Sequence, residues 1–149
     1  MYDRILVAID GSATASRACT EAIKLAVDQK ARLRVLHVLS FSFVSAVLGS
    51  TTGGGDLLRR LRADGQDTLD ATEAEAVRAG VEVEPRLLEH HSTQIGEAIV
   101  EDAEKWRAKV IVVGTHGRRG FARDVMGSDA EYVALHSPVP VLLVRSTSA

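Results

Sequence analysis

The feature that most constrains the fold is a regular alternation of short apolar runs with longer segments of helical periodicity. Runs rich in Val, Ile and Leu recur at residues 5–9, 33–39, 81–88, 110–113 and 139–144. The first and fourth are apolar throughout, which is typical of strands buried on both faces of a parallel sheet. Because helical segments separate the runs, each connection is predicted to cross over to a parallel neighbour.

Apolar residues at helical spacing fill the intervals, at residues 15–26, 58–76, 95–106 and about 128–136, with Ser128 near an N-cap. Gly65 weakens the second segment, and Gly80 stands where that helix should stop. We expect an irregular connection over residues 41–55 with a mobile, glycine-rich end. The pattern predicts one doubly wound, Rossmann-like α/β domain over residues 1–149. Its five parallel strands should run in the order 3-2-1-4-5, with helices on both faces.

Composition excludes several classes of function. Eighteen Lys and Arg residues are balanced by 20 Asp and Glu residues, so a field that attracts nucleic acid is not expected. A single cysteine, Cys19, rules out a disulfide within the chain and a Cys-rich metal site. No apolar run approaches the roughly 18 residues that a membrane span requires, and the first residues lack signal-peptide features. We therefore expect a cytoplasmic protein without a membrane partner.

Two predicted strands end in residues suited to a ligand site. The first is followed by Asp10, Gly11 and Ser12, and the fourth by Gly114, Thr115, His116 and Gly117. In open α/β sheets, ligands bind outside the carboxyl ends of the strands, where the strand order reverses. Asp10 is therefore either a ligand contact or a cap or turn residue for the following helix.

The fourth strand end continues with a distinctive glycine spacing: Gly114, two residues, Gly117, nine residues, Gly127 and then Ser128. Glycine lets backbone N–H groups approach a phosphate, and the free N–H groups at a helix start favour an anion. The loop also carries three basic residues that either reach a phosphate or stay in solvent, Arg118, Arg119 and Arg123. The spacing predicts an anion cradle; ordinary helix capping is the alternative.

Other chemistry-bearing residues have simpler interpretations. His90 and His91 are adjacent and would point to opposite faces of an extended chain, so we do not expect them to share a metal ion. Cys19 lies on an apolar helical stripe, which predicts a buried and inert thiol. Trp106 completes a similar stripe and is expected in the core. His136 falls in the last turn of a helix, where it complements the dipole.

The segment G-T-H-G-R-R-G-F-A-R-D-V-M-G-S resembles the ATP-binding signature of the universal stress protein family, G-x2-G-x9-G-[ST]. The opening I-L-V-A-I-D-G-S and the closing H-S-P-V-P-V-L-L-V also resemble that family, so the likeness spans the chain. It implies that a bound ATP borders Ala8, Ile9 and Asp10, with Val38 offering backbone contacts to adenine. It places the ribose and phosphates beside Gly114, Thr115, His116, Gly117, Gly127, Ser128, Asp129 and Ala130. A Mg2+ ion would bridge the phosphate oxygens.

Asp129 departs from the family pattern, in which a small apolar residue often follows the Gly-Ser pair. A carboxylate in the first helical turn favours the helix N-terminus. It either competes with a bound phosphate or points away and only stabilises the helix.

The expected function is an ATP-binding regulatory or stress-response role with at most slow hydrolysis or autophosphorylation, because the spacing identifies no general base. One alternative is a stress protein that acts through protein contacts without nucleotide. Another is the same fold with a different ligand, such as cyclic AMP or a flavin.

The last apolar run, Val139 to Val144, should lie at an edge of the sheet and is interrupted by Pro140. An exposed apolar edge favours aggregation unless it is paired or covered. The family resemblance implies that this strand pairs between two subunits, giving a two-fold homodimer.

Overall fold

A computed structural model describes residues 1–10, 12–40, 54–90, 94–116 and 126–145. Within these residues the chain forms one five-stranded parallel sheet with the strand order β3-β2-β1-β4-β5, which confirms the expected topology. In chain order the elements are β1 (Arg4–Ile9), α1 (Ala13–Gln29), β2 (Arg32–Ser40), α3 (Gly54–Arg78), β3 (Glu82–His90), α4 (Ile95–Trp106), β4 (Val110–Gly114), α5 (Ser128–His136) and β5 (Val141–Val144).

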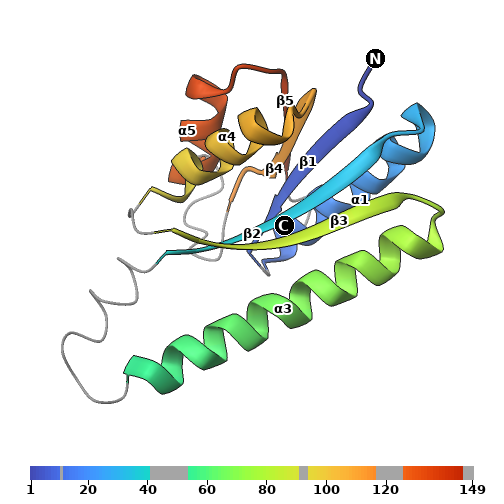
Figure 1. The fold of residues 1–149 in the computed structure, drawn as a ribbon. Coiled ribbons are helices and arrows are strands. Elements are labelled where there is room, and N and C mark those ends of the chain that lie inside the picture. The colour runs from blue at the N-terminus through green and yellow to red at the C-terminus, as the bar shows by residue number, and fades with distance from the viewer. Residues whose placement is uncertain (11, 41–53, 91–93, 117–125, 146–149) are drawn as a thin grey trace.

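The helices form two layers, with α1 and α3 on one face of the sheet and α4 and α5 on the other (Figure 1). The central strands are apolar on both sides because each face needs a core. Ile5 and Val7 of β1 pack into the cluster beneath α1 and α3, whereas Leu6 packs into the cluster beneath α4, and none of the three is exposed. The interpretation of continuous apolar runs as doubly buried strands is therefore confirmed.

Helix α3 continues for 25 residues straight through Gly65. A Cβ added at Gly65 would come within 3.0 Å of His37 Cδ2 and 3.1 Å of Leu87 Cδ1, so the glycine allows the helix to lie close to β2 and β3. The described helix starts at Gly54, so residues 54 and 55, which were expected in the irregular connection, are helical. The rest of that expected connection, residues 41–53, lies outside the described part of the chain.

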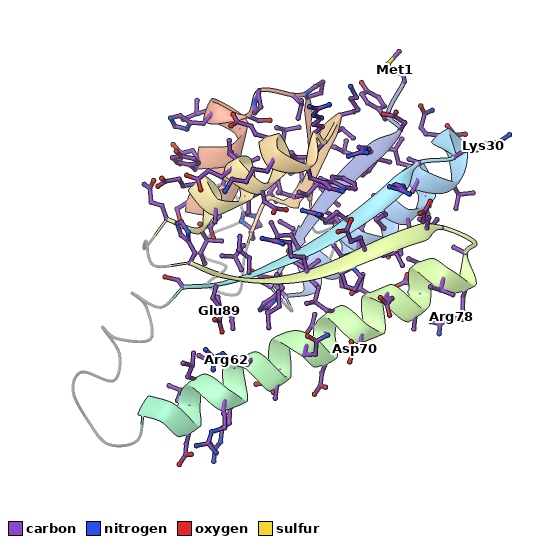
Figure 2. The ribbon with its side chains drawn as sticks, viewed as in Figure 1. Met1, Lys30, Arg62, Asp70, Arg78 and Glu89 are labelled. Carbon is purple, nitrogen blue, oxygen red and sulfur yellow. The ribbon has the colours of Figure 1, made fainter. Side chains whose placement is uncertain are left out.

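The far end of α3 follows the prediction, since the helix stops at Arg78 and Gly80 has a φ of +81°. An ion pair between Arg62 of α3 and Glu89 of β3 joins helix and sheet near the other end (Figure 2). Both side chains are partly exposed to solvent, so the pair contributes little to stability.

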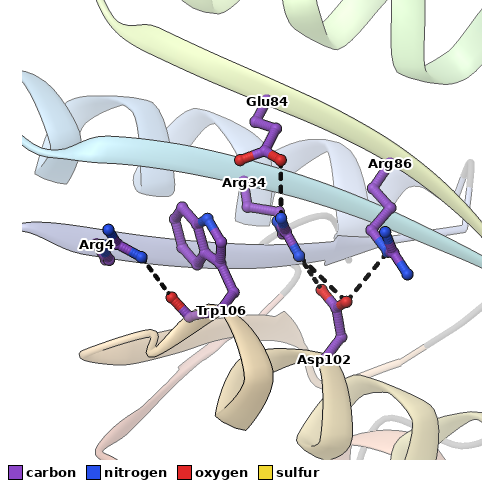
Figure 3. A network of polar contacts seen from close by, with 6 residues as sticks. All are labelled: Arg4, Arg34, Glu84, Arg86, Asp102 and Trp106. Atoms are coloured by element: carbon purple, nitrogen blue, oxygen red, sulfur yellow. Dashed lines mark hydrogen bonds and ion pairs between the residues drawn. The ribbon is translucent and has the colours of Figure 1, made fainter.

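A charged cluster links α4 to β2 and β3 (Figure 3). Both carboxylate oxygens of Asp102 accept hydrogen bonds from Arg34 Nη1, at 3.1 and 3.0 Å, and Oδ1 lies 3.1 Å from Arg86 Nε. Arg34 Nη2 also donates to Glu84 Oε1 at 2.8 Å. The Arg34 guanidinium lies 5.0 Å from the centre of the Trp106 ring, which is buried as expected. We call Arg34, Glu84, Arg86 and Asp102 the Asp102 network.

The last strand is shorter than expected, because β5 begins at Val141 and not at Val139. The Ser137 hydroxyl donates to the Val139 carbonyl at 2.7 Å and accepts from the Val139 amide at 3.1 Å, which holds Val139 in a turn. Pro140 has no N–H to give to a ladder, although its carbonyl accepts from Ile111 of β4. The strand does lie at the edge of the sheet, as expected.

Candidate functional site

The candidate site lies at the carboxyl edge of the sheet, between β1 and β4. Strand β2 lies on one side of β1 and β4 lies on the other, so the strand order reverses between β1 and β4. Asp10 directly follows β1, and Thr115 directly follows β4. Because all strands run in parallel, both residues reach the same edge, which is where ligands of such sheets bind.

The N-terminus of α1 is capped by its own side chains. Asp10 Oδ1 accepts a hydrogen bond from the Ser12 amide at 2.9 Å, and Ser12 Oγ accepts from the Ala15 amide at 3.1 Å. Ser12 is thus the N-cap, and Asp10 forms the turn before it. The structure shows Asp10 in the predicted turn, while its contact with a ligand stays a prediction. The Ser12 cap means that this helix end offers fewer free donors to an anion.

The N-terminus of α5 differs, because its N-cap residue makes no side-chain cap bond. Gly127 is the N-cap, and Ser128, which was expected near that position, is the exposed first helical residue. Glycine provides no side-chain acceptor for the first-turn N–H groups, so the N-cap itself satisfies none of these donors. The helix end meets the requirements of an anion site.

Thr115 connects this helix end to the sheet. The Gly127 amide donates to the Thr115 carbonyl at 2.6 Å, and the Thr115 amide donates to Val144 of β5 at 3.0 Å. Thr115 is only 8% exposed, yet its hydroxyl has no hydrogen-bond partner among the residues that the structure describes. A buried polar group without a partner is costly, which makes this hydroxyl a candidate ligand contact.

Gly114 has a packing role that the sequence did not reveal. A Cβ added there would come within 2.6 Å of Thr14 Cγ2 and 3.1 Å of the Thr14 carbonyl carbon. Thr14 is buried in the first turn of α1. The missing Cβ at Gly114 therefore lets α1 pack against β4, and this contact explains the glycine without a phosphate.

The residues expected near adenine fall on two faces of the sheet. Ala8 and Val38 pack against the cluster beneath α4 and α5, whereas Ile9 belongs to the cluster beneath α1 and α3. The structure thus brings Ala8 and Val38 together on one side and turns Ile9 to the other. Val38 is 8% exposed, so its backbone is better placed than its side chain to contact a ligand.

The first turn of α5 is acidic, with Asp129 and Glu131 and no basic residue between Ser128 and Glu131. Ala130 points into the core, while Asp129 is half-buried. At the other end of the helix, His136 Nδ1 lies 3.0 Å from the Tyr132 carbonyl oxygen, in the last turn as expected.

Several predicted positions lie outside the described residues, namely Gly117, Arg118, Arg119, Arg123 and His91. His116 is described and half-buried at the end of β4. Across the described ranges, no group of three or more His, Cys, Asp or Glu side chains is arranged to hold a metal ion. Nor does any helix of those ranges have the length and apolar character to cross a membrane.

An open groove of about 420 Å³ lies between α1 and α3, and sequence reasoning did not indicate it. Its walls are lined by small and hydroxyl side chains, with Asp67 and Glu75 among them. Cys19 lines it too but is only 4% exposed. Burial raises the pKa of the Cys19 thiol to about 12, although a hydrogen bond with Thr72 opposes the shift. The thiol stays protonated at neutral pH, as expected for an inert cysteine.

The fold and this edge define the chain as a doubly wound α/β domain in which a helix with a glycine N-cap starts at the reversal of strand order. The chain belongs to the universal stress protein family, whose sequence profile matches residues 1–145.

Among its relatives is a universal stress protein of Thermus aquaticus, 36% identical over 146 residues, covering 97% of this chain and 100% of the relative. A crystal structure of a family protein from Burkholderia pseudomallei is similar with a TM-score of 0.79 and 34% identity, over 97% of both chains. The Archaeoglobus fulgidus universal stress protein in complex with dAMP has a TM-score of 0.68 and 26% identity, over 96% of this chain and 98% of that one.

Proposed function

We propose that this protein binds ATP at the carboxyl edge of β1 and β4 and acts as a nucleotide-responsive regulatory protein. The observation that carries the proposal is the N-terminus of α5, whose N-cap Gly127 offers no side-chain acceptor. Gly127 is bonded to Thr115, whose buried hydroxyl has no partner in the described part of the chain. The similar Archaeoglobus fulgidus protein, solved with dAMP, supports an adenine nucleotide as the ligand class.

In this proposal the first turn of α5 holds the phosphates. The backbone N–H groups of Ser128, Asp129 and Ala130 donate to phosphate oxygens, and the Ser128 hydroxyl adds a further donor. The Thr115 hydroxyl gains the partner that it lacks. Gly127 leaves room for the phosphate, because a side chain at the N-cap would stand in front of these donors.

The rest of the nucleotide extends toward β1 and β2. Adenine lies against Ala8 and the backbone of Val38, which share a face of the sheet. Asp10 lies at the end of β1, where a carboxylate accepts hydrogen bonds from ribose hydroxyls. His116 and the backbone of Gly114 border the ribose and phosphates from β4.

A Mg2+ ion at this site would be held mainly by the nucleotide phosphates and less by protein side chains. Mg2+ prefers oxygen ligands and often takes one or two protein oxygens beside the phosphates. The described residues form no metal-binding cluster of their own but supply the hydroxyls of Thr115 and Ser128 at the helix end. When bound, the ion would neutralise part of the phosphate charge.

A regulatory role is favoured over efficient catalysis. The only cysteine is buried with a raised pKa, so it supplies no thiolate nucleophile. Because the sequence spacing also identifies no general base, we expect at most slow hydrolysis or autophosphorylation of bound ATP.

Calorimetry with ATP and Mg2+ on Gly127→Val tests the proposal. The φ of −60° and ψ of 149° at Gly127 suit valine, so the variant should fold while its side chain obstructs the phosphates. We expect the wild-type protein to bind and Gly127→Val to lose about tenfold or more in affinity, or roughly 1.4 kcal/mol. Gly55→Val is the matched control, because nothing lies within 4 Å of a Cβ there. Equal affinity in all three proteins would place the ligand elsewhere.

We also propose that β5 pairs with β5 of a second copy to form a two-fold dimer. Leu142 is 41% exposed and Leu143 37% exposed on a strand whose outer edge faces no other strand in the described residues. Pairing the two edges would satisfy their backbone groups and cover these side chains.

Light scattering should give twice the 16.0 kDa mass of one chain for the wild type and a single-chain mass for Leu143→Lys. Leu135→Lys serves as the control, because Leu135 is 72% exposed on α5 and lies outside the strand. A wild-type mass near that of one chain contradicts the dimer.

A further inference from the structure

We propose that Asp129 is a specificity-determining residue that makes nucleotide affinity depend on the charge of the phosphates. The proposal rests on the nucleotide site proposed above. It goes beyond that site because it predicts which charge states of the ligand the protein accepts, and it concerns a carboxylate that needs no contact with adenine or ribose.

Position alone brings this carboxylate close to any phosphate at the helix end. Asp129 is the second residue of α5, and a helix rises about 1.5 Å per residue. A phosphate on the first-turn N–H groups therefore lies within roughly 8–10 Å of the Asp129 carboxylate, whichever rotamer the side chain adopts. The turn is also held from behind, since Gly96 of α4 packs so closely that an added Cβ would come within 3.1 Å of the Asp129 carbonyl oxygen.

A second observation marks this end of α5 as a ligand site. Thr115 accepts the Gly127 amide through its carbonyl and is more than nine-tenths buried. Its hydroxyl has no partner in the part of the chain that the structure describes. The N-terminus of α1 at the same edge differs, because Ser12 caps it.

The charge of the ligand sets the size of the effect. The Asp129 carboxylate repels each phosphate charge, and at this distance near a protein surface the repulsion grows with every negative charge added. Free ATP carries more negative charge than AMP, and Mg2+ neutralises part of the charge of ATP. Asp129 should therefore oppose free ATP most, and should oppose the magnesium complex and AMP less, because these two ligands carry similar net charges. Without ligand, the same carboxylate stabilises the helix N-terminus.

Calorimetry on wild type and Asp129→Asn with AMP, ATP plus Mg2+, and ATP plus EDTA tests this order. Relative to wild type, we expect Asp129→Asn to bind free ATP about tenfold more tightly, and to bind AMP and the magnesium complex each about threefold more tightly. Glu104→Gln removes one carboxylate from an exposed position in the last turn of α4 and should change none of the three affinities. The melting temperature of Asp129→Asn should fall slightly, because the helix loses its first-turn charge.

The outcomes separate this proposal from the one on which it rests. If wild type binds but the variant changes all three affinities by one common factor, or changes none, Asp129 does not set charge preference and the nucleotide site still stands. If neither protein binds any of the three ligands, both the site and the charge preference are wrong.

Discussion

Replacing Asp102 with Asn should destabilise the fold more than any other isosteric carboxylate change in the described part of the chain. Asp102 is 4% exposed and receives two hydrogen bonds from Arg34, which is itself 8% exposed, and an ion pair from Arg86. Asn keeps the shape but leaves two guanidinium groups facing a neutral amide. Breaking a buried pair by changing one partner costs about 3–5 kcal/mol.

The lower end of that range applies here, because Arg34 keeps its contact to Glu84 at 2.8 Å. The Glu84 side chain is 55% exposed, so solvent screens that contact and it compensates only in part. We expect a loss of about 3 kcal/mol of unfolding free energy, or a melting temperature lower by about 6–12 °C. Urea unfolding followed by far-UV circular dichroism measures this loss independently of Trp106, whose ring lies against Arg34.

Glu101→Gln is the matched control, since Glu101 is the exposed neighbour of Asp102 on α4 and should change stability by less than about 0.5 kcal/mol. The double variant Arg34→Met with Asp102→Leu removes both buried charges and should recover much of the loss. A loss of unfolding free energy below about 1 kcal/mol for Asp102→Asn would contradict this prediction. It would mean that Arg34 is not a desolvated charge that needs Asp102 as its partner.

Two further changes test other contacts. Gly114→Ala places a Cβ 2.6 Å from Thr14 Cγ2 and should lower the unfolding free energy measured in urea by about 1–3 kcal/mol. Thr14→Ser removes that methyl group, so Gly114→Ala should cost less in the Thr14→Ser background. Equal losses in both backgrounds would contradict the contact. The Cys19 pKa is raised from 9.0 to about 12, so the folded state holds its proton more tightly. The stabilisation that results is complete below pH 9 and is lost as pH rises toward 12. Wild-type stability should thus fall more steeply over that interval than that of Cys19→Ala, and parallel curves would show that the thiol is not buried.

The sheet could be predicted from sequence because its central strands have no polar face. Residues 5–9 and 110–113 are apolar throughout, and only strands covered on both sides tolerate that pattern. Parallel crossovers then place helices on both faces, and the predicted strand order is that of the common doubly wound sheet.

Packing decided the features that the sequence did not reveal. Helix propensity makes Gly65 a weak point, but the close approach of His37 and Leu87 requires a residue without a side chain there. Gly114 likewise serves the contact with Thr14, although its spacing indicated a phosphate. Pro140 and the Ser137 turn shortened the last strand from the predicted start at Val139.

Part of the Asp102 network could have been predicted from charged residues in the sequence. Arg34 pairs in register with Glu84, and Arg86 follows two residues later on the same face of β3. Charges on alternate residues of neighbouring strands indicate cross-strand ion pairs. Asp102 also falls on the buried stripe of α4 beside Ala103 and Ile99, where a carboxylate needs a partner.

We propose that an adenine nucleotide binds between the carboxyl ends of β1 and β4 and the N-terminus of α5. Hydrogen exchange with and without ATP and Mg2+ tests it most directly, because it locates the ligand on the chain. We expect the nucleotide to slow exchange of the amides at Thr115 and in residues 127–130, with smaller protection at the end of β1. ATP binding without protection of α5, or with protection confined to the groove between α1 and α3, would show that the nucleotide does not bind at the carboxyl ends of β1 and β4.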